Sequence, residues 1–174
     1  MEIIVERDGA ALADRAAEVV FAALQRKPDL VMGLATGKTP VGLYERLRRK
    51  PEAFARVRFF NLDEFFGLAP SDPLSFNHFL HHHFLDHVKH DPKNECLLRG
   101  DVPDLEALAS EVEARIREAG GIDLQVLGIG GNGHVGFNEP GSSLGSRTRP
   151  KALEPGTLAD YSTGPDLPRF AITM

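Results

Sequence analysis

Two adjacent acids, Asp63 and Glu64, follow a short apolar run typical of a buried strand. Phenylalanines flank the pair on both sides, and an apolar wall raises the pKa of a carboxyl group. Such a group suits a general base, so Asp63 is a candidate for proton transfer. The alternative interpretation is that one of the two acids caps the next helix or forms a surface ion pair.

A second candidate segment is the turn of Thr36, Gly37, Lys38 and Thr39, which follows an apolar run at residues 30–34. Its glycine lets the backbone approach a ligand closely. The free N–H groups at the start of the next helix attract an anion. The turn is therefore a candidate phosphate-binding loop, although it lacks the spacing of a Walker A loop. An ordinary strand-to-helix turn is the alternative.

The third candidate segment, residues 127–140, is rich in glycine. It contains Asn132, His134 and Glu139, a candidate proton-transfer group, because a nearby carboxylate can fix the tautomer of a histidine. It also contains G-x-G-x-x-G, which opens a helix in dinucleotide-binding proteins. Further glycines and a proline interrupt such a helix here, so we do not assign dinucleotide binding. A solvated histidine on a surface loop is the alternative.

Six of the seven histidines lie between His78 and His90. The pairs His78/His82 and His83/His87 have the i, i+4 spacing with which a helix can hold a metal ion. No spacing singles out a third ligand. A solvated helix face is therefore the preferred interpretation, and no metal site is assigned.

Hydrophobic periodicity predicts the elements that position these segments. We expect strands over residues 2–6, 30–34, 57–62, 122–127 and 169–174, and helices over residues 11–26, 39–49, 75–88 and 104–119. Thr39 is the expected N-cap of the second helix, with Pro40 as its first residue. The alternation predicts an α/β fold: a doubly wound, mainly parallel Rossmann-like sheet with helices on both faces, in a single domain over residues 1–174. Ligands of such sheets bind beyond the carboxyl ends of the strands.

The composition excludes several classes of protein. The chain has 174 residues, 42% hydrophobic and 26% charged, as expected for a globular domain. Its formal charge of −5 disfavours nucleic acid and anionic membranes as partners. The single cysteine, Cys96, excludes a disulfide within the chain. The apolar runs are too short to span a bilayer and the first residues do not resemble a signal peptide, so a cytoplasmic protein is expected.

The candidate segments together resemble the glucosamine-6-phosphate deaminase family. The matching sequence motifs are LATGKTP, FNLDEFFGL, GIGGNGHVGFNEPGSSLGSRTR and RFAITM. They occur in the same order as in the family and span nearly the whole chain. The resemblance implies conversion of glucosamine 6-phosphate and water to fructose 6-phosphate and ammonia in amino-sugar catabolism, without a metal or organic cofactor. The related 6-phosphogluconolactonases share the fold and the Asp-Glu strand end, but carry a G-H-T-A-S-type word.

The resemblance also implies a role for each candidate residue. Asp63 corresponds to the base that moves a proton between C2 and C1 of the sugar. His134, oriented by Glu139, corresponds to the acid–base group that opens the sugar ring. The family has Asp or Asn at the position of Asn132, and an amide here would orient His134 rather than carry a proton. Residues 36–39 resemble the phosphate loop.

Two departures from the family pattern concern the phosphate site. Members continue past the A-I-T-M word with a glycine turn, a helix and a lysine that contacts the phosphate. An arginine that meets the phosphate in some members falls near Thr163 here. The domain is therefore expected to be truncated at its C-terminus, with residues 169–174 forming an uncovered parallel strand.

Three functional hypotheses follow: a deaminase, a 6-phosphogluconolactonase-like hydrolase, and a non-catalytic sugar-phosphate-binding module. The retained acid–base residues argue against the last, because a pure sensor needs no base. A small-molecule sugar phosphate is the expected ligand in each case. The oligomeric state stays open, a homo-oligomer included. Ser142, Arg149 and Lys151 resemble the activator site of hexameric members, with a solvated basic loop as the alternative.

Overall fold

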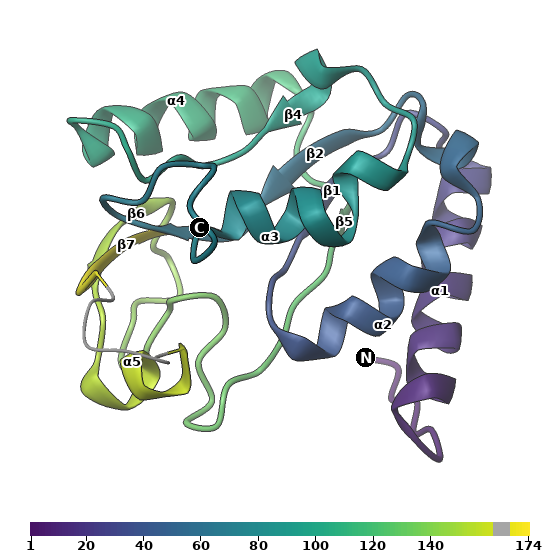
Figure 1. Cartoon of the computed structure of the whole chain (residues 1–174), viewed down its shortest axis with the longest axis horizontal. Helices are drawn as coiled ribbons and strands as arrows, with labels where there is room; N and C mark the ends of the chain where they lie inside the picture. The colour runs from purple at the N-terminus through teal and green to yellow at the C-terminus, as the bar shows by residue number, and fades with distance from the viewer. Residues whose placement is uncertain (162–167) are drawn as a thin grey trace.

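The computed structural model describes residues 1–161 and 168–174 (Figure 1). Its strands are β1 (Val31–Leu34), β2 (Arg58–Asn61), β3 (Asp63–Phe65), β4 (Glu95–Cys96), β5 (Leu124–Gln125), β6 (Arg149–Ala152) and β7 (Phe170–Thr173). Its α-helices are α1 (Gly9–Arg26), α2 (Lys38–Leu47), α3 (Phe76–His83), α4 (Leu105–Glu118) and α5 (Pro155–Tyr161). Short 3₁₀ helices span Pro51–Phe54, Leu85–His87 and Pro92–Asn94.

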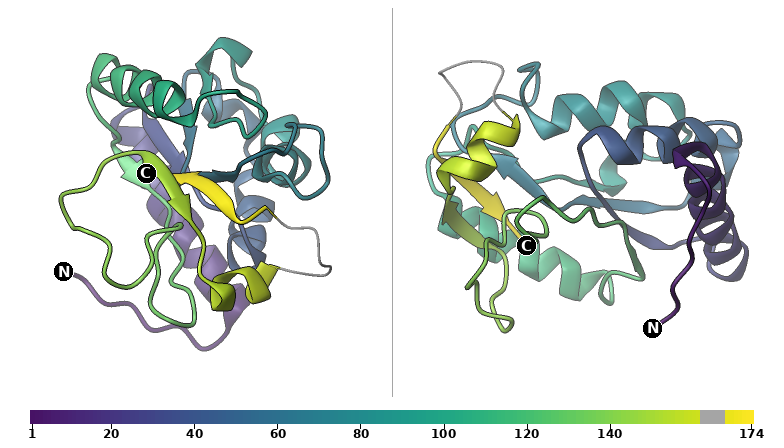
Figure 2. Two further views of the ribbon diagram at one scale, coloured as in Figure 1. Left: turned by 90° about the vertical axis from the view of Figure 1, so that its left-hand side faces the viewer. Right: turned by 90° about the horizontal axis from the view of Figure 1, so that it is seen from below.

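Four parallel strands form the main sheet, in the order β4-β2-β1-β5. Successive side chains of a strand point to opposite faces of its sheet. Accordingly, Met32 and Phe59 pack with α1, α2 and α3, whereas Val31 and Phe60 pack with α4. Helices therefore cover both faces, as the two views of Figure 2 show. The predicted doubly wound α/β fold is confirmed.

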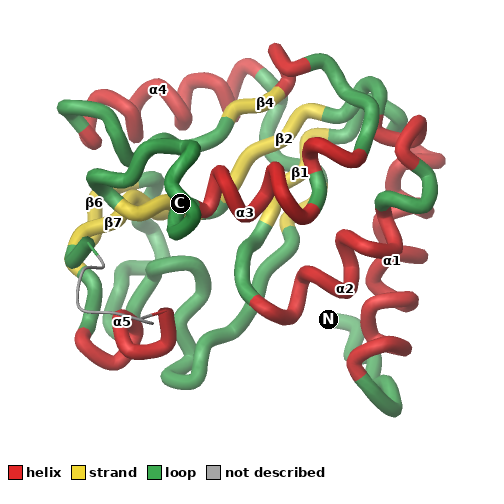
Figure 3. Tube along the Cα trace, viewed as in Figure 1, coloured by secondary structure: helices red, strands yellow, loops and turns green. Residues whose placement is uncertain are grey.

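A second sheet of three antiparallel strands, in the order β3-β7-β6, continues from the first. Figure 3 shows β6 and β7 to one side of β1 and β2. The chain passes between the sheets at Leu62, whose N–H donates to the Leu34 carbonyl at 3.1 Å. The Leu62 carbonyl in turn accepts from the N–H of Met174 at 3.0 Å. The sequence pattern predicts only β7 of this sheet, because β3 begins just after the predicted strand at residues 57–62 and β6 lies in a segment for which no element is predicted.

Two sequence predictions about strands are wrong. Residues 2–6 form no strand; they are largely exposed, with Ile3 75% and Val5 87% exposed. β-Branched residues favour a strand only where they can pack within a sheet, and this segment pairs with no strand in the described part of the chain. The last strand is not an uncovered parallel edge. β7 instead lies between β3 and β6, antiparallel to both, with Ala171 and Ile172 buried.

Other elements differ from the prediction at their ends. α2 begins at Lys38 with Gly37 as its N-cap, so Thr39 lies inside the helix and Pro40 is its third residue. A proline is tolerated there because the first N–H groups of a helix have no partner within it. α3 ends at His83 and is continued by a 3₁₀ turn. Within residues 1–161 and 168–174, no helix has the length and hydropathy needed to cross a membrane.

Candidate active site

The carboxyl ends of β1, β2 and β5 lie at one edge of the parallel sheet, where a cavity of about 440 Å³ opens. The loop after β1, the start of β3 and the glycine-rich segment line it together. The lining residues are Ala35, Thr36, Gly37, Lys38, Thr39, Pro40, Leu62, Asp63, Leu127, Gly128, Ile129, Gly130, His134 and Gly136. The fold thus brings together all three predicted segments, and of the predicted site residues only Asn132 and Glu139 lie outside this lining.

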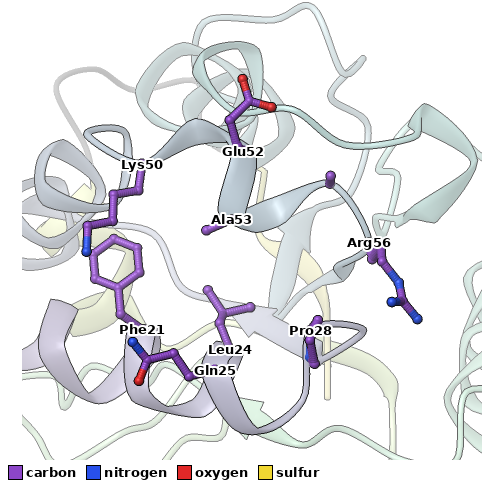
Figure 4. Close-up of a pocket in the computed structure, with 9 residues that line it drawn as sticks. Phe21, Leu24, Gln25, Pro28, Lys50, Glu52, Ala53 and Arg56 are labelled. Carbon is purple, nitrogen blue, oxygen red and sulfur yellow. The ribbon is translucent and has the colours of Figure 1, made fainter.

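A different cavity, of about 340 Å³, lies at the amino ends of β1 and β2 (Figure 4). Leu24 and Ala53 contribute to its apolar part, and the Lys50 ammonium lies 4.8 Å from the centre of the Phe21 ring. None of the predicted site residues lines it. Ligands of parallel sheets bind at the carboxyl ends of the strands, so we assign the candidate site to the cavity of about 440 Å³.

The candidate phosphate-binding loop, residues 36–39, lies at the start of α2. Gly37 is the N-cap with a φ of 104°, a backbone conformation that favours glycine. No side chain caps this helix start, which leaves its first N–H groups for an anion. The exposed Lys38 adds a positive charge beside them. The Tyr44 hydroxyl donates to the Ala35 carbonyl and thereby ties the loop to its helix.

Asp63 lies directly after the crossing between the sheets and is 5% exposed. Burial, and secondly the charge of Glu64, raise the pKa of Asp63 from 3.8 to about 8. Asn61 fixes the strand end: its Nδ2 donates to the Asp63 carbonyl at 2.9 Å, and its Oδ1 accepts from the Leu98 N–H at 2.6 Å. A carboxyl group with a pKa near neutrality can both take up and return a proton.

Glu64 has a different environment from its neighbour. Its fully buried carboxylate accepts hydrogen bonds from the N–H groups of Phe76 and Asn77 at the start of α3. Ser75, the N-cap of that helix, also donates to it through its hydroxyl. The helix-cap interpretation of the acid pair therefore holds for Glu64.

Asn132, His134 and Glu139 form a hydrogen-bonded chain. Asn132 Oδ1 accepts from the backbone N–H of His134 at 3.0 Å and lies 2.6 Å from His134 Nδ1. Asn132 Nδ2 donates to Glu139 Oε2 at 3.1 Å. Because an amide oxygen only accepts, Nδ1 carries the proton and Nε2 is the basic nitrogen of the neutral ring. Glu139 thus contacts His134 through Asn132, to which the resemblance also gives an orienting role.

Glu139 is 3% exposed. Burial alone would raise the pKa of Glu139, but contacts with Thr157, with Asn132 and with the N–H of Glu154 outweigh it and lower the pKa below its usual range. An ionised Glu139 accepts hydrogen bonds only, so it holds the NH₂ side of the Asn132 amide towards itself. The amide oxygen is then directed to His134.

Gly130 is a site residue that the sequence analysis does not single out. A Cβ atom at this position would lie 2.1 Å from His134 Cε1, so only glycine leaves room for the ring. The Gly130 N–H also donates to the His134 carbonyl at 2.9 Å. The available sequence signal is its place in the G-x-G-x-x-G pattern, which here makes room for an imidazole instead of a pyrophosphate.

The histidines around α3 lie outside the cavity. His81 contacts Asp86 at 2.9 Å and Glu95 at 3.4 Å, and the interaction with Glu95 is the main cause that raises the pKa of His81 to about 9. His90 also pairs with Glu95 and is nearly buried, so the solvated face predicted for this set is wrong for His90. In the described part of the chain, no three His, Cys, Asp or Glu side chains are placed to hold a metal ion.

The residues that resemble an activator site lie apart from the main cavity. Ser142 lines a separate cavity of about 360 Å³ together with Asn138 and Glu139. Arg149 donates to Asn138 Oδ1 at 2.9 Å, and Lys151 lies two residues further along β6. Thr163, where the resemblance places a phosphate-binding arginine in some members, lies outside the described residues.

Comparison with known proteins identifies the family to which the chain belongs. Residues 7–148 match the family described as glucosamine-6-phosphate isomerases/6-phosphogluconolactonase. The chain belongs to this family. It is 45% identical to glucosamine-6-phosphate deaminase 2 of Bacillus subtilis (strain 168), with all of the chain and 74% of that protein aligned. It is 44% identical to glucosamine-6-phosphate deaminase of Shewanella loihica, with all of the chain and 68% of that protein aligned.

Solved structures of family members show the same fold. A monomeric glucosamine-6-phosphate deaminase matches with a TM-score of 0.94 and 36% identity, over all of this chain and 76% of that one. The 6-phosphogluconolactonase of Thermotoga maritima matches with a TM-score of 0.79 and 21% identity, over 98% of this chain and 75% of that one. At 21% identity the second match supports the fold alone.

The raised pKa of Asp63 predicts a pH dependence of stability. The folded chain binds this proton more tightly than the unfolded chain, so its stabilising effect is complete below pH 3.8 and is lost as the pH rises through about 8. We expect the stability of Asp63→Asn relative to the parent to rise with pH over this window, by a few kcal/mol between pH 4 and pH 9. Urea unfolding at pH 4, 6 and 9 measures the difference.

The matched control for this experiment is Asp29→Asn, because Asp29 is exposed. Its stability relative to the parent should change little across the same pH range. A constant difference between Asp63→Asn and the parent from pH 4 to 9 would contradict the buried, proton-binding state of Asp63.

The close fit of Gly130 against His134 predicts a positional effect. Gly130→Ala should displace the imidazole, because the added methyl group cannot share its space. Gly131→Ala is the control, since a Cβ at Gly131 has nothing within 4 Å. We expect Gly130→Ala, and not Gly131→Ala, to shift the His134 ring signals in ¹H–¹⁵N spectra. Gly130→Ala should also reduce the rate of the enzyme's reaction about 10²-fold. Equal effects of both substitutions would refute this role of Gly130.

Proposed function

We propose that this chain converts glucosamine 6-phosphate and water to fructose 6-phosphate and ammonia. The observation that carries the proposal is the shared cavity, in which a helix start suited to a phosphate, a buried carboxyl group and a histidine of defined tautomer meet. The identity of 40–45% to proteins named glucosamine-6-phosphate deaminase supports the choice of reaction.

The reaction needs two separate proton transfers, and the cavity offers a group for each. The neutral His134, through Nε2, takes the proton of the ring hydroxyl at C1 and returns a proton to the ring oxygen, which opens the sugar. Asp63 then takes the proton from C2 and returns it to C1. In the same isomerisation the aldehyde oxygen gains a proton and the amino nitrogen loses one, so the amino aldehyde becomes a 2-imine with a hydroxyl group at C1. Hydrolysis of that imine by water releases ammonia and leaves the ketone.

The remaining residues bind and orient. Gly37, Lys38 and Thr39, with the free N–H groups of α2, hold the phosphate, and the Thr36 hydroxyl extends this contact. Asn132 and Glu139 fix the orientation of the histidine. None of these steps calls on a metal or organic cofactor.

We assign the enzyme to the cytoplasm and to the catabolism of N-acetylglucosamine, because its expected substrate is a phosphorylated amino sugar. We leave a homo-oligomer open. Of the residues that resemble an activator site, Ser142 lines a separate cavity and Arg149 contacts Asn138 of its lining, whereas Lys151 does not line it.

Two assays test the proposed reaction on the full chain: ammonia release from glucosamine 6-phosphate, and hydrolysis of 6-phosphogluconolactone. We expect ammonia release in the first and little turnover in the second. Asp63→Asn should lower the deaminase rate by about 10²–10⁴-fold while substrate binding persists, because the amide cannot take the C2 proton. Lactone hydrolysis without ammonia release would support the 6-phosphogluconolactonase-like alternative, and sugar-phosphate binding without either reaction would support a non-catalytic binding module.

The separation of the two proton-transfer groups predicts a second effect. His134→Gln should slow the reaction of the closed pyranose far more than the reaction of an open-chain analogue, because only the closed form needs ring opening. Steady-state rates on the two substrates make the comparison. An equal loss on both would show that His134 does not open the ring.

A further inference from the structure

Glu64 accepts five hydrogen bonds and is fully buried. Oε1 accepts from the N–H groups of Phe65 at 2.8 Å and Phe76 at 3.1 Å. Oε2 accepts from the Ser75 hydroxyl at 2.7 Å and from the N–H and Nδ2 of Asn77 at 3.0 and 2.7 Å. A carboxyl group surrounded by donors in this way is ionised, because only the ionised form is purely an acceptor.

A network of hydrogen bonds holds this charge at a fixed place in the residue that follows Asp63 on β3. Asn77 Nδ2 donates to the Leu98 carbonyl at 2.6 Å as well as to Glu64. The Leu98 N–H donates to Asn61, and Asn61 donates to the Asp63 carbonyl. The two acids are thus joined through the chain and through these three residues, so Glu64 cannot move away from its neighbour.

Three other titratable or charged groups lie near Asp63 in the structure. Glu64 adjoins it on β3, and Lys38 of α2 and His134 of the glycine-rich segment line the same cavity. Lys38 is exposed, so solvent screens its charge, whereas Glu64 is fully buried. After burial, the charge of Glu64 is the second cause of the raised pKa of Asp63.

We propose that Glu64 is a positioning residue, a fixed negative charge that makes the neighbouring Asp63 a stronger base. A hydrogen on carbon beside a carbonyl is weakly acidic, so its removal is faster with a stronger base. Capping of α3 supplies the donors that keep Glu64 ionised at this depth. The inference rests on the proposed function only for the step in which Asp63 acts; the electrostatic effect exists without substrate.

Glu64→Gln tests the inference, because it keeps the shape and removes the charge. We expect the pH at which Asp63 titrates, followed by carboxyl ¹³C NMR, to fall by about one unit or more. The acid limb of the pH–rate profile should move down equally, and the maximal rate should fall as Asp63 becomes a weaker base. Ser75→Ala is the control, since it removes one donor from Glu64 and leaves its charge. That variant should lose stability without any downward shift in the titration of Asp63.

The unmodified chain provides a second measurement that does not depend on the folding of a variant. The carboxyl ¹³C signal of Glu64 should remain that of an ionised group throughout the pH range in which Asp63 titrates. A protonated Glu64 in that range, or an unchanged Asp63 titration in folded Glu64→Gln, would overturn the inference. Neither NMR experiment uses a substrate, so absent deaminase activity with the expected titrations would reject the proposed reaction and leave the role of Glu64 intact.

Discussion

Leu62 joins the two sheets, and the candidate site depends on its backbone hydrogen bonds. Its N–H continues the parallel ladder to Leu34, and its carbonyl begins the antiparallel pairing with the end of the chain at Met174. The next residue, Asp63, is therefore held at the fork between the sheets, where both shield it from water. This placement makes the carboxyl group buried and yet adjacent to the cavity, which is the combination a base for carbon acids needs.

The parallel sheet supplies the rest of the geometry. Since β1, β2 and β5 run in one direction, the segments that follow them meet at the same edge of the sheet although they are distant in the sequence. These segments contribute the N–H groups at the start of α2, the carboxyl group of Asp63 and the oriented imidazole of His134. Glu64 links Asp63 to α3, because the carboxylate that accepts from the first N–H groups of that helix also raises the pKa of Asp63, as the second cause after burial.

The sequence predicts the parts of this arrangement that depend on local pattern. Periodicity identifies the parallel sheet and its covering helices, and strand-end positions identify the three site segments. Periodicity fails where strand pairing is non-local. Residues 2–6 have strand propensity without a partner strand, and the short strands β3 and β6 are not predicted because their pairing with β7 brings together distant parts of the sequence. The link from Glu139 to His134 through Asn132, and the space that Gly130 leaves for the imidazole, follow from side-chain placement that residue spacing does not encode.

If the proposed function is correct, one cavity holds a sugar phosphate with its phosphate at the start of α2 and its C2 beside Asp63. The decisive experiment is a crystal structure with the reduced open-chain 2-amino-alditol 6-phosphate, which cannot isomerise. We expect the phosphate at the N–H groups after Gly37, and the carbon that bears the amine next to the Asp63 carboxyl group. A phosphate bound elsewhere, or an amine-bearing carbon out of reach of Asp63, would refute this arrangement.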